Sequence, residues 1–378
     1  MRNQQDGGPR PRICMPTARL FKRMVFQSAL YEAQDVLAEV DEVELLDLVA
    51  TDRFRRFQPL QRKLLWHDVT DRLALLNPGL APVRLTESYD ALILVCQNWW
   101  DLLHLNAISG WQSKCGTTLC YVDELYAADL AAYRHWLPAL ARFDHVVLGM
   151  RGSLAAVERA IGKRCHYVPV GIDALRFTPH PNPPPRVVDV YSIGRRWPRM
   201  HESLLSYAST TGSFYVFDAM VGVADVSTTC HVEYRRALAN VVKRSRHFVV
   251  GPAKLAVDET CGQQELGYRF FEGAAAGAVM IGQAPDCAAF KELFGWPDSV
   301  VPLKPDGSDV VETLESLRAQ PDRLEEMSRR NAREALLRHD WVYRWMQILA
   351  IAGLEPTPRM SARVDRLRAL AGLIPGAD

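Results

Sequence analysis

The chain has 378 residues, which makes two domains the default expectation. Its 45 Lys and Arg residues and 44 Asp and Glu residues leave a formal net charge of +1, so overall charge gives no reason to expect nucleic acid as a partner. No apolar run approaches the ~18–20 residues of a membrane span. The eight cysteines contain no CxxC pair, which favours buried free thiols over a zinc site and indicates a reducing, cytoplasmic compartment.

The first part of the chain predicts alternating strands and helices. Residues 1–12 are polar and rich in Gly and Pro, lack the apolar core of a signal peptide, and indicate a flexible leader. Residues 89–96 (YDALILVC) are typical of a strand in a parallel sheet that is covered on both faces. An Ala- and Leu-rich helix is expected up to about residue 142. The expected strands are residues 13–15, 43–49, 89–96, 117–122, 145–148 and 166–170.

A proline-rich segment divides the chain. Residues 178–186 read TPHPNPPPR, a composition that excludes both helix and central strand and predicts an extended linker, centred on 179–186. Beyond it the alternation restarts, and the last helices, within 341–378, are expected to cross back to the first domain. The expected strands of the second half are residues 187–193, 213–217, 247–250 and 278–281.

This alternation predicts an α/β protein made of two Rossmann-like, doubly wound domains, at residues 13–178 and 187–340. In such sheets ligands bind outside the carboxyl ends of the strands. We therefore expect a ligand in the cleft between the two domains.

The most informative stretch is residues 262–282, GQQELGYRFFEGAAAGAVMIG. A Gly-bearing loop, including Gly267, leads into a helix whose first turn is expected to face the cleft. The exposed amides and the positive end of the helix dipole favour a phosphate group there. Glu272, expected to face solvent and ligand, offers a carboxylate to the hydroxyls of a ribose. An ordinary helix-to-strand connection is equally compatible with this spacing alone.

The segment resembles the "E-x7-E … A-x-G-x-V" signature of retaining glycosyltransferases with the GT-B fold, family 4 or "glycosyl transferases group 1". Glu272 falls on the second glutamate, which in that family binds the nucleotide ribose. The position of the first glutamate, which contacts the donor sugar, holds Gln264, with Glu265 beside it. Either Glu265 takes the sugar-contacting, catalytic role or Gln264 does so by hydrogen bonding.

Residues 192–205, SIGRRWPRMHESLL, are similar to the family's phosphate-binding segment. The match places Gly194 and Arg195 at the donor, with Arg199 as the cation nearest to the family's lysine. Lys254, after the strand at 247–250, is a second candidate cation. Guanidinium groups suit a diphosphate because two N–H groups can meet two oxygens, whereas the plain alternative is ordinary surface charge.

The first domain is expected to supply the acceptor side. Asp123 and Glu124 follow the strand at 117–122, and a carboxylate at that position faces the cleft. Such a carboxylate can orient or deprotonate an acceptor hydroxyl. Alternatively, Asp123 merely caps a helix that begins at residue 125. Trp99 and Trp100 can stack on a sugar or pack in the core. His104 is expected to be structural.

The resemblance implies transfer of a sugar from a nucleoside diphosphate to an acceptor hydroxyl with retention, without a metal or a resident cofactor. The acceptor is a glycan, a lipid or a small molecule, and contact with a membrane is at most peripheral. A nucleotide-sugar epimerase and a catalytically silent GT-B domain that acts as a regulator or scaffold are the alternatives. A dehydrogenase is disfavoured, since no GxGxxG follows the first strand.

Overall fold

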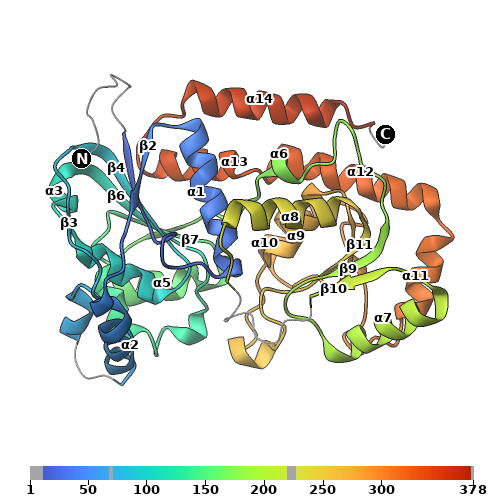
Figure 1. The fold of residues 1–378 in the computed structure, drawn as a ribbon, viewed down its shortest axis with the longest axis horizontal. Helices are drawn as coiled ribbons and strands as arrows, with labels where there is room; N and C mark the ends of the chain where they lie inside the picture. The colour runs from blue at the N-terminus through green and yellow to red at the C-terminus, as the bar shows by residue number, and fades with distance from the viewer. Residues whose placement is uncertain (1–11, 68–70, 219–226, 376–378) are drawn as a thin grey trace.

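The computed structural model describes residues 12–67, 71–218 and 227–375 of the chain. The leader expected at residues 1–12 therefore lies almost wholly outside the described residues. Two parallel sheets stand side by side, each covered by helices, and α1 (Ser28–Val40) lies between them (Figure 1). This is the α/β architecture that the alternating pattern predicted.

The first sheet has six parallel strands in the order β2-β1-β4-β6-β7-β8. Its central strand β4 pairs with β6 over seven residues, from Tyr89 opposite Cys115 to Cys96 opposite Val122. Both strands are buried almost throughout, because helices cover both faces of the sheet. The strands of the first part, with the small β3–β5 pair, are β1 (Ile13–Thr17), β2 (Val43–Asp47), β3 (Val83–Arg84), β4 (Tyr89–Cys96), β5 (Ile108–Ser109), β6 (Cys115–Val122), β7 (His145–Leu148) and β8 (Cys165–Tyr167).

The second sheet has five parallel strands in the order β10-β9-β11-β12-β13. The described segment 178–187, which holds the predicted linker, contains neither helix nor strand and connects the two sheets. The strands are β9 (Val188–Ser192), β10 (Tyr215–Phe217), β11 (Ser245–Val250), β12 (Val279–Gly282) and β13 (Val301–Pro302). The helices that follow the linker are α7 (Pro198–Thr211), α8 (His231–Lys243), α9 (Tyr268–Ala275), α10 (Ala288–Phe294), α11 (Val310–Arg318), α12 (Pro321–Arg338), α13 (Trp341–Ile351) and α14 (Pro358–Gly372).

The last two helices pack against the first domain as well as the second. The indole Nε1 of Trp345 on α13 donates to the carbonyl of Ala33 on α1 at 2.8 Å. On α14, Arg359 forms an ion pair with Glu42 at 2.6 Å. Figure 1 shows α14 running across the top of the molecule, above α1, α13 and α12. Within the described residues, no helix has both the length and the apolarity needed to cross a bilayer.

One expectation about the first domain's helices was wrong, and one helix was not anticipated. The helix expected up to residue 142 is broken into η4 (Ala127–Asp129), η5 (Arg134–Trp136) and α4 (Leu137–Leu140), with turns between them. Tertiary packing overrides the helical preference of this Ala-rich segment: Trp136 is 1% exposed and Tyr133 stacks on Trp99. A helix that the sequence reading did not propose, α2, spans Asp52–Trp66 in spite of Pro59 inside it. The remaining short helices are α3 (Trp111–Lys114), α5 (Leu154–Ile161) and α6 (Ala174–Phe177).

A buried ion cluster fixes the crossover between the domains. Arg363 on α14 donates to Asp340 from Nε at 2.9 Å and to Asp173 from Nη2 at 2.7 Å. Asp173 also caps α6 by accepting from the amide of Arg176 at 3.3 Å. Burial raises the pKa of Asp340, and the positive charge of Arg363 opposes that rise. The guanidinium thus places a positive charge between two buried carboxylates.

Replacing Arg363 by alanine is expected to destabilise the protein by about 3–5 kcal/mol, because it leaves Asp340 and Asp173 buried without a cation. The free energy of unfolding from urea titration measures this. The matched control is Arg366→Ala on the exposed side of the same helix, expected to change it by no more than about 0.5 kcal/mol. Equal, small losses in both variants would contradict a structural role for the cluster.

Candidate active site

A cleft of about 820 Å³ lies between the two domains. It is lined by the segments that follow β4, β6 and β7 of the first sheet and β9, β10 and β11 of the second, together with the start of α9. Both sheets therefore turn their carboxyl ends toward the cleft, which is where doubly wound domains bind ligands. Of the predicted site residues, those that line the cleft are Asp123, Glu124, Gly194, Arg195, Lys254, Gly267 and Glu272.

The first domain contributes a carboxylate with an unusual proton affinity. Asp123 follows β6, is 5% exposed, and accepts a hydrogen bond at 3.0 Å from the hydroxyl of Tyr268 in the second domain. Burial, with the charge of the neighbouring Glu124, raises the pKa of Asp123 to about 7, although the Tyr268 hydrogen bond opposes the rise. No helix begins at residue 125, so the capping role considered for Asp123 is not realised.

Glu124 faces cations from the second domain. Burial raises the pKa of Glu124, while the positive charges of Arg195 and Lys254 oppose that rise. The ammonium of Lys254 lies 4.4 Å from the centre of the Tyr126 ring and 4.0 Å from a carboxylate oxygen of Asp129. Negative charge from the first domain and positive charge from the second thus meet across the cleft.

The loop after β9 takes a shape that glycine permits. Gly194 has φ +79°, in the left-handed region that side chains disfavour, and its amide donates to Asp218 at 2.9 Å. A Cβ there would lie 3.3 Å from the guanidinium of Arg269. This turn leaves Arg195 exposed at the cleft.

The start of α9 borders the same space. Gly267 is its N-cap residue and provides no side-chain cap. A Cβ on Gly267 would lie 3.2 Å from the carbonyl oxygen of Gly251, so glycine lets the helix start close to the loop after β11. The uncapped first amides of α9, with the positive end of its dipole, make this part of the cleft suitable for an anion.

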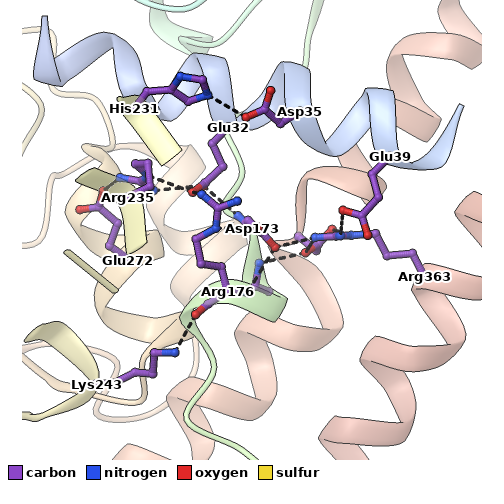
Figure 2. A network of polar contacts seen from close by, with 12 residues as sticks. Glu32, Asp35, Glu39, Asp173, Arg176, His231, Arg235, Lys243, Glu272 and Arg363 are labelled. Carbon is purple, nitrogen blue, oxygen red and sulfur yellow. Dashed lines mark hydrogen bonds and ion pairs between the residues drawn. The ribbon is translucent and has the colours of Figure 1, made fainter. Parts of the chain in front are cut away.

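Glu272 belongs to a chain of buried charges that connects the two domains. Arg235 on α8 donates to Glu272 and, through Nε at 2.9 Å and Nη2 at 3.1 Å, to Glu32 on α1 (Figure 2). Arg269, one turn earlier on α9, donates to the other oxygen of Glu272. Burial alone would raise the pKa of Glu272, but the charges of Arg269 and Arg235 outweigh it and lower the pKa.

The expectation that Glu272 faces solvent was wrong. Its side chain is 1% exposed, although the residue contributes to the cleft wall. Two arginines converge on it because a buried carboxylate needs cationic partners to stay ionised. The donor-binding role of Glu272 remains a prediction.

Three other predicted residues do not line the cleft. Gln264 accepts from the amide of Asp286 at 2.8 Å, on the far side of its loop. Glu265, 3% exposed, accepts from the amide of Gly152 at 2.8 Å and thereby joins the second domain to the first. Arg199 is exposed on α7. The catalytic and donor-binding roles of these residues remain predictions.

The comparisons with known proteins give a family model for part of the chain and a fold for most of it. Residues 185–350 match the family model described as "Glycosyl transferase-like". A glycosyltransferase from Rickettsia africae shares 9% identity with a TM-score of 0.51, over 91% of this chain and 98% of that one. The chain has the GT-B fold, and residues 185–350 are similar to glycosyltransferases. The family match confirms the class of enzyme expected from the sequence, and the solved structures confirm the fold.

Two further structures are similar to this glycosyltransferase-like chain. Anabaena Alr3699/HepE in complex with UDP-glucose shares 10% identity with a TM-score of 0.51, over 90% and 99% of the two chains. An alpha-glucosyltransferase in complex with UDP and a DNA 13-mer shares 10% identity with a TM-score of 0.56, also over 90% and 99%. Identities this low establish the fold alone. Among curated proteins, none matches the chain significantly.

The cleft also contains residues that the sequence analysis did not single out. Tyr268 and Arg269 lie inside the segment already singled out, so their position four and three residues before Glu272, about one helical turn, was an available signal. Arg235 had no such signal, because it is one of several charged residues on a predicted helix. Within the described residues, no cluster of three or more His, Cys, Asp or Glu side chains is arranged to hold a metal ion.

Both tryptophans after β4 line the cleft, although one of them is almost fully buried. Trp99 is 2% exposed and stacks on Tyr133 with ring centres 5.2 Å apart. Trp100 lies at the cleft with the guanidinium of Arg62 3.8 Å from its ring centre. His104 is buried beside Phe21, and burial lowers its pKa to about 3. It is a neutral core residue, as the sequence suggested.

Replacing Glu272 by alanine is expected to destabilise this protein by about 3 kcal/mol or more, because Arg235 and Arg269 lose a buried counter-charge. Urea unfolding of the ligand-free protein measures the change. Glu312→Ala, at an exposed position of α11, is the control and should lie within about 0.5 kcal/mol of the parent. A Glu272 variant as stable as the control would contradict the buried ion chain.

Proposed function

We propose that this protein transfers a sugar from a nucleoside diphosphate to an acceptor hydroxyl with retention of configuration, and that it needs neither a resident cofactor nor a metal ion. The observation that carries the proposal is the division of charge across the cleft. Cations from the second domain, Arg195 and Lys254, face carboxylates from the first, Asp123 and Glu124. The first set suits a diphosphate and the second suits a hydroxyl that must lose a proton.

The donor is assigned to the second-domain side. The diphosphate lies between the start of α9 at Gly267 and the guanidinium of Arg195, which stabilise the negative charge that develops as the sugar departs. Glu272 keeps lone pairs beyond those used by its two arginines, and these accept the ribose hydroxyls. UDP-sugars are the first donors to test, since two similar structures contain UDP or UDP-glucose.

The acceptor is assigned to the first-domain side. Asp123, at the end of β6, accepts the proton of the attacking hydroxyl or orients that hydroxyl, and its raised pKa matches a proton acceptor that works near neutral pH. The hydrogen bond from Tyr268 connects this carboxylate to the first residue of α9. Donor and acceptor groups are thereby held in one geometry across the cleft.

A nucleotide-binding protein without transferase activity is the second candidate. It is favoured by the position of Glu265, whose carboxylate is engaged with Gly152 outside the cleft lining, and by that of Gln264. Such a protein would be stabilised by a nucleotide sugar, since a ligand at ~100 times its Kd adds about 2.7 kcal/mol, but would never release the nucleotide. Thermal shift followed by UDP release separates the two candidates.

With UDP-sugar turnover as the assay, Arg195→Ala is expected to lower kcat about 100-fold or more, because it removes a preorganised charge from the departing diphosphate. Arg199→Ala is the matched control, since this arginine is exposed on α7 outside the cleft lining, and should change kcat less than twofold. Nucleotide release followed over time gives both values. The reverse order of effects would move the diphosphate site to the start of α7.

A base at Asp123 makes the reaction pH-dependent. The carboxylate must be ionised, so kcat/KM is expected to rise with pH through about 7. Tyr268→Phe removes a hydrogen bond that stabilises the ionised form, so the midpoint of that rise should move to higher pH. Asp123→Asn should remove the dependence and lower the rate about 10²–10⁴-fold. An unmoved midpoint in the Tyr268 variant would contradict this role of the hydrogen bond.

A further inference from the structure

Helix α2 presents an outer face that is both basic and apolar. Its inner side is a stripe of buried residues at helical spacing, formed by Gln58, Gln61 and Leu65. On the outer side Leu60 is 51% exposed and Trp66 is 55% exposed. Arg56 and Lys63 are also exposed. They are seven residues apart and therefore lie on the same side of the helix, between Leu60 and Trp66 when the helix is viewed along its axis. The outer face of α2 therefore carries both cationic and large apolar side chains.

The charge of this helix is unbalanced. Its fifteen residues contain five cations and one acid, Asp52, although the whole chain has a net charge of only +1. The cations are Arg53, Arg55, Arg56, Arg62 and Lys63. Among the described residues, none of these five forms an ion pair, whereas Arg359, Arg363 and Arg368 of the other basic helix, α14, all do.

Exposed apolar residues gather in the same part of the chain. Six of the twelve large hydrophobic residues that the described structure leaves exposed fall between residues 20 and 76. These six are Leu20, Val49, Leu60, Trp66, Leu75 and Leu76. In Figure 1, α2 lies at the lower left edge of the first domain, on the side of the molecule away from α14.

We infer that the outer face of α2 docks on the surface of an anionic lipid bilayer. Arg and Lys side chains are attracted to acidic headgroups, and Leu and Trp side chains enter the boundary between headgroups and acyl chains. Nucleic acid also attracts cations, but its phosphates offer no gain for burying Leu60 or Trp66. The combination of both residue types on one face therefore favours lipid.

The helix lies at the rim of the cleft. The guanidinium of Arg62 stacks over Trp100. The ring of Trp66 packs edge-on against Tyr133 with ring centres 5.6 Å apart. Both Trp100 and Tyr133 line the cleft. Docking through α2 therefore holds the first-domain side of the cleft at the lipid surface. If the proposed transfer reaction holds, its acceptor is presented there by the membrane; the docking itself does not depend on that reaction.

The test is flotation of the full-length protein with vesicles of phosphatidylcholine, alone or mixed equally with phosphatidylglycerol, at low and high salt. We expect binding to the anionic vesicles only, and weaker binding at high salt. The triple variant Arg56→Gln, Leu60→Gln and Lys63→Gln should lose at least about 25-fold in partitioning, since each cation near an anionic surface is worth about a factor of five.

The matched control makes three comparable exchanges on α14 and at its C-cap residue: Arg366→Gln, Arg368→Gln and Leu373→Gln. Leu373 is 63% exposed, so the control removes two cations and one exposed leucine as well, and it should bind like the parent. If the α2 triple variant does not fold, Arg56→Gln with Lys63→Gln replaces it. No binding to anionic vesicles, or equal losses in both variants, would overturn the proposal. Binding to duplex DNA that Leu60→Gln leaves unchanged, without vesicle binding, would instead assign the face to nucleic acid.

Discussion

The arrangement of the two domains depends on one buried guanidinium. Arg235 is 2% exposed and pairs with Glu32 of the first domain and Glu272 of the second. A buried charge must keep its partners, so α1, α8 and α9 are held at fixed distances from one another. Because α9 starts at the cleft, the same interaction that joins the domains also sets the wall against which a ligand would bind.

The direction of the strands determines which charged residues line the cleft. All strands of each sheet are parallel, so their carboxyl ends fall on one edge, and the two edges face each other. Loops on the first edge carry Asp123 and Glu124, and loops on the second carry Arg195 and Lys254. The hydrogen bond between Asp123 and Tyr268 spans the gap. Closure of the domains and the proton affinity of the first-domain carboxylate are therefore coupled.

Two basic helices use their charge in opposite ways. Arg363 of α14 is 6% exposed and neutralises the buried carboxylates at the domain crossover, so its charge serves stability. The cations of α2 face outward beside Leu60 and Trp66. The near-zero net charge of the whole chain conceals this local excess, and so whole-chain composition gave no reason to expect a charged surface.

Local sequence determined most of the element pattern, because hydrophobic periodicity and proline act within a few residues. The two-sheet architecture, the linker at 179–186 and the segment around Glu272 all follow from such short-range signals. Periodicity failed at residues 125–142, where tertiary packing overrode local preference. Helix α2 was not anticipated, and Pro59 inside it is a local signal against a helix. Only the tertiary structure decided which side chains contact one another at the cleft. Arg235 meets Glu32 across 203 positions, and Tyr268 meets Asp123 across 145. Glu272 is buried for the same reason: its exposure depends on helices that only the fold brings together.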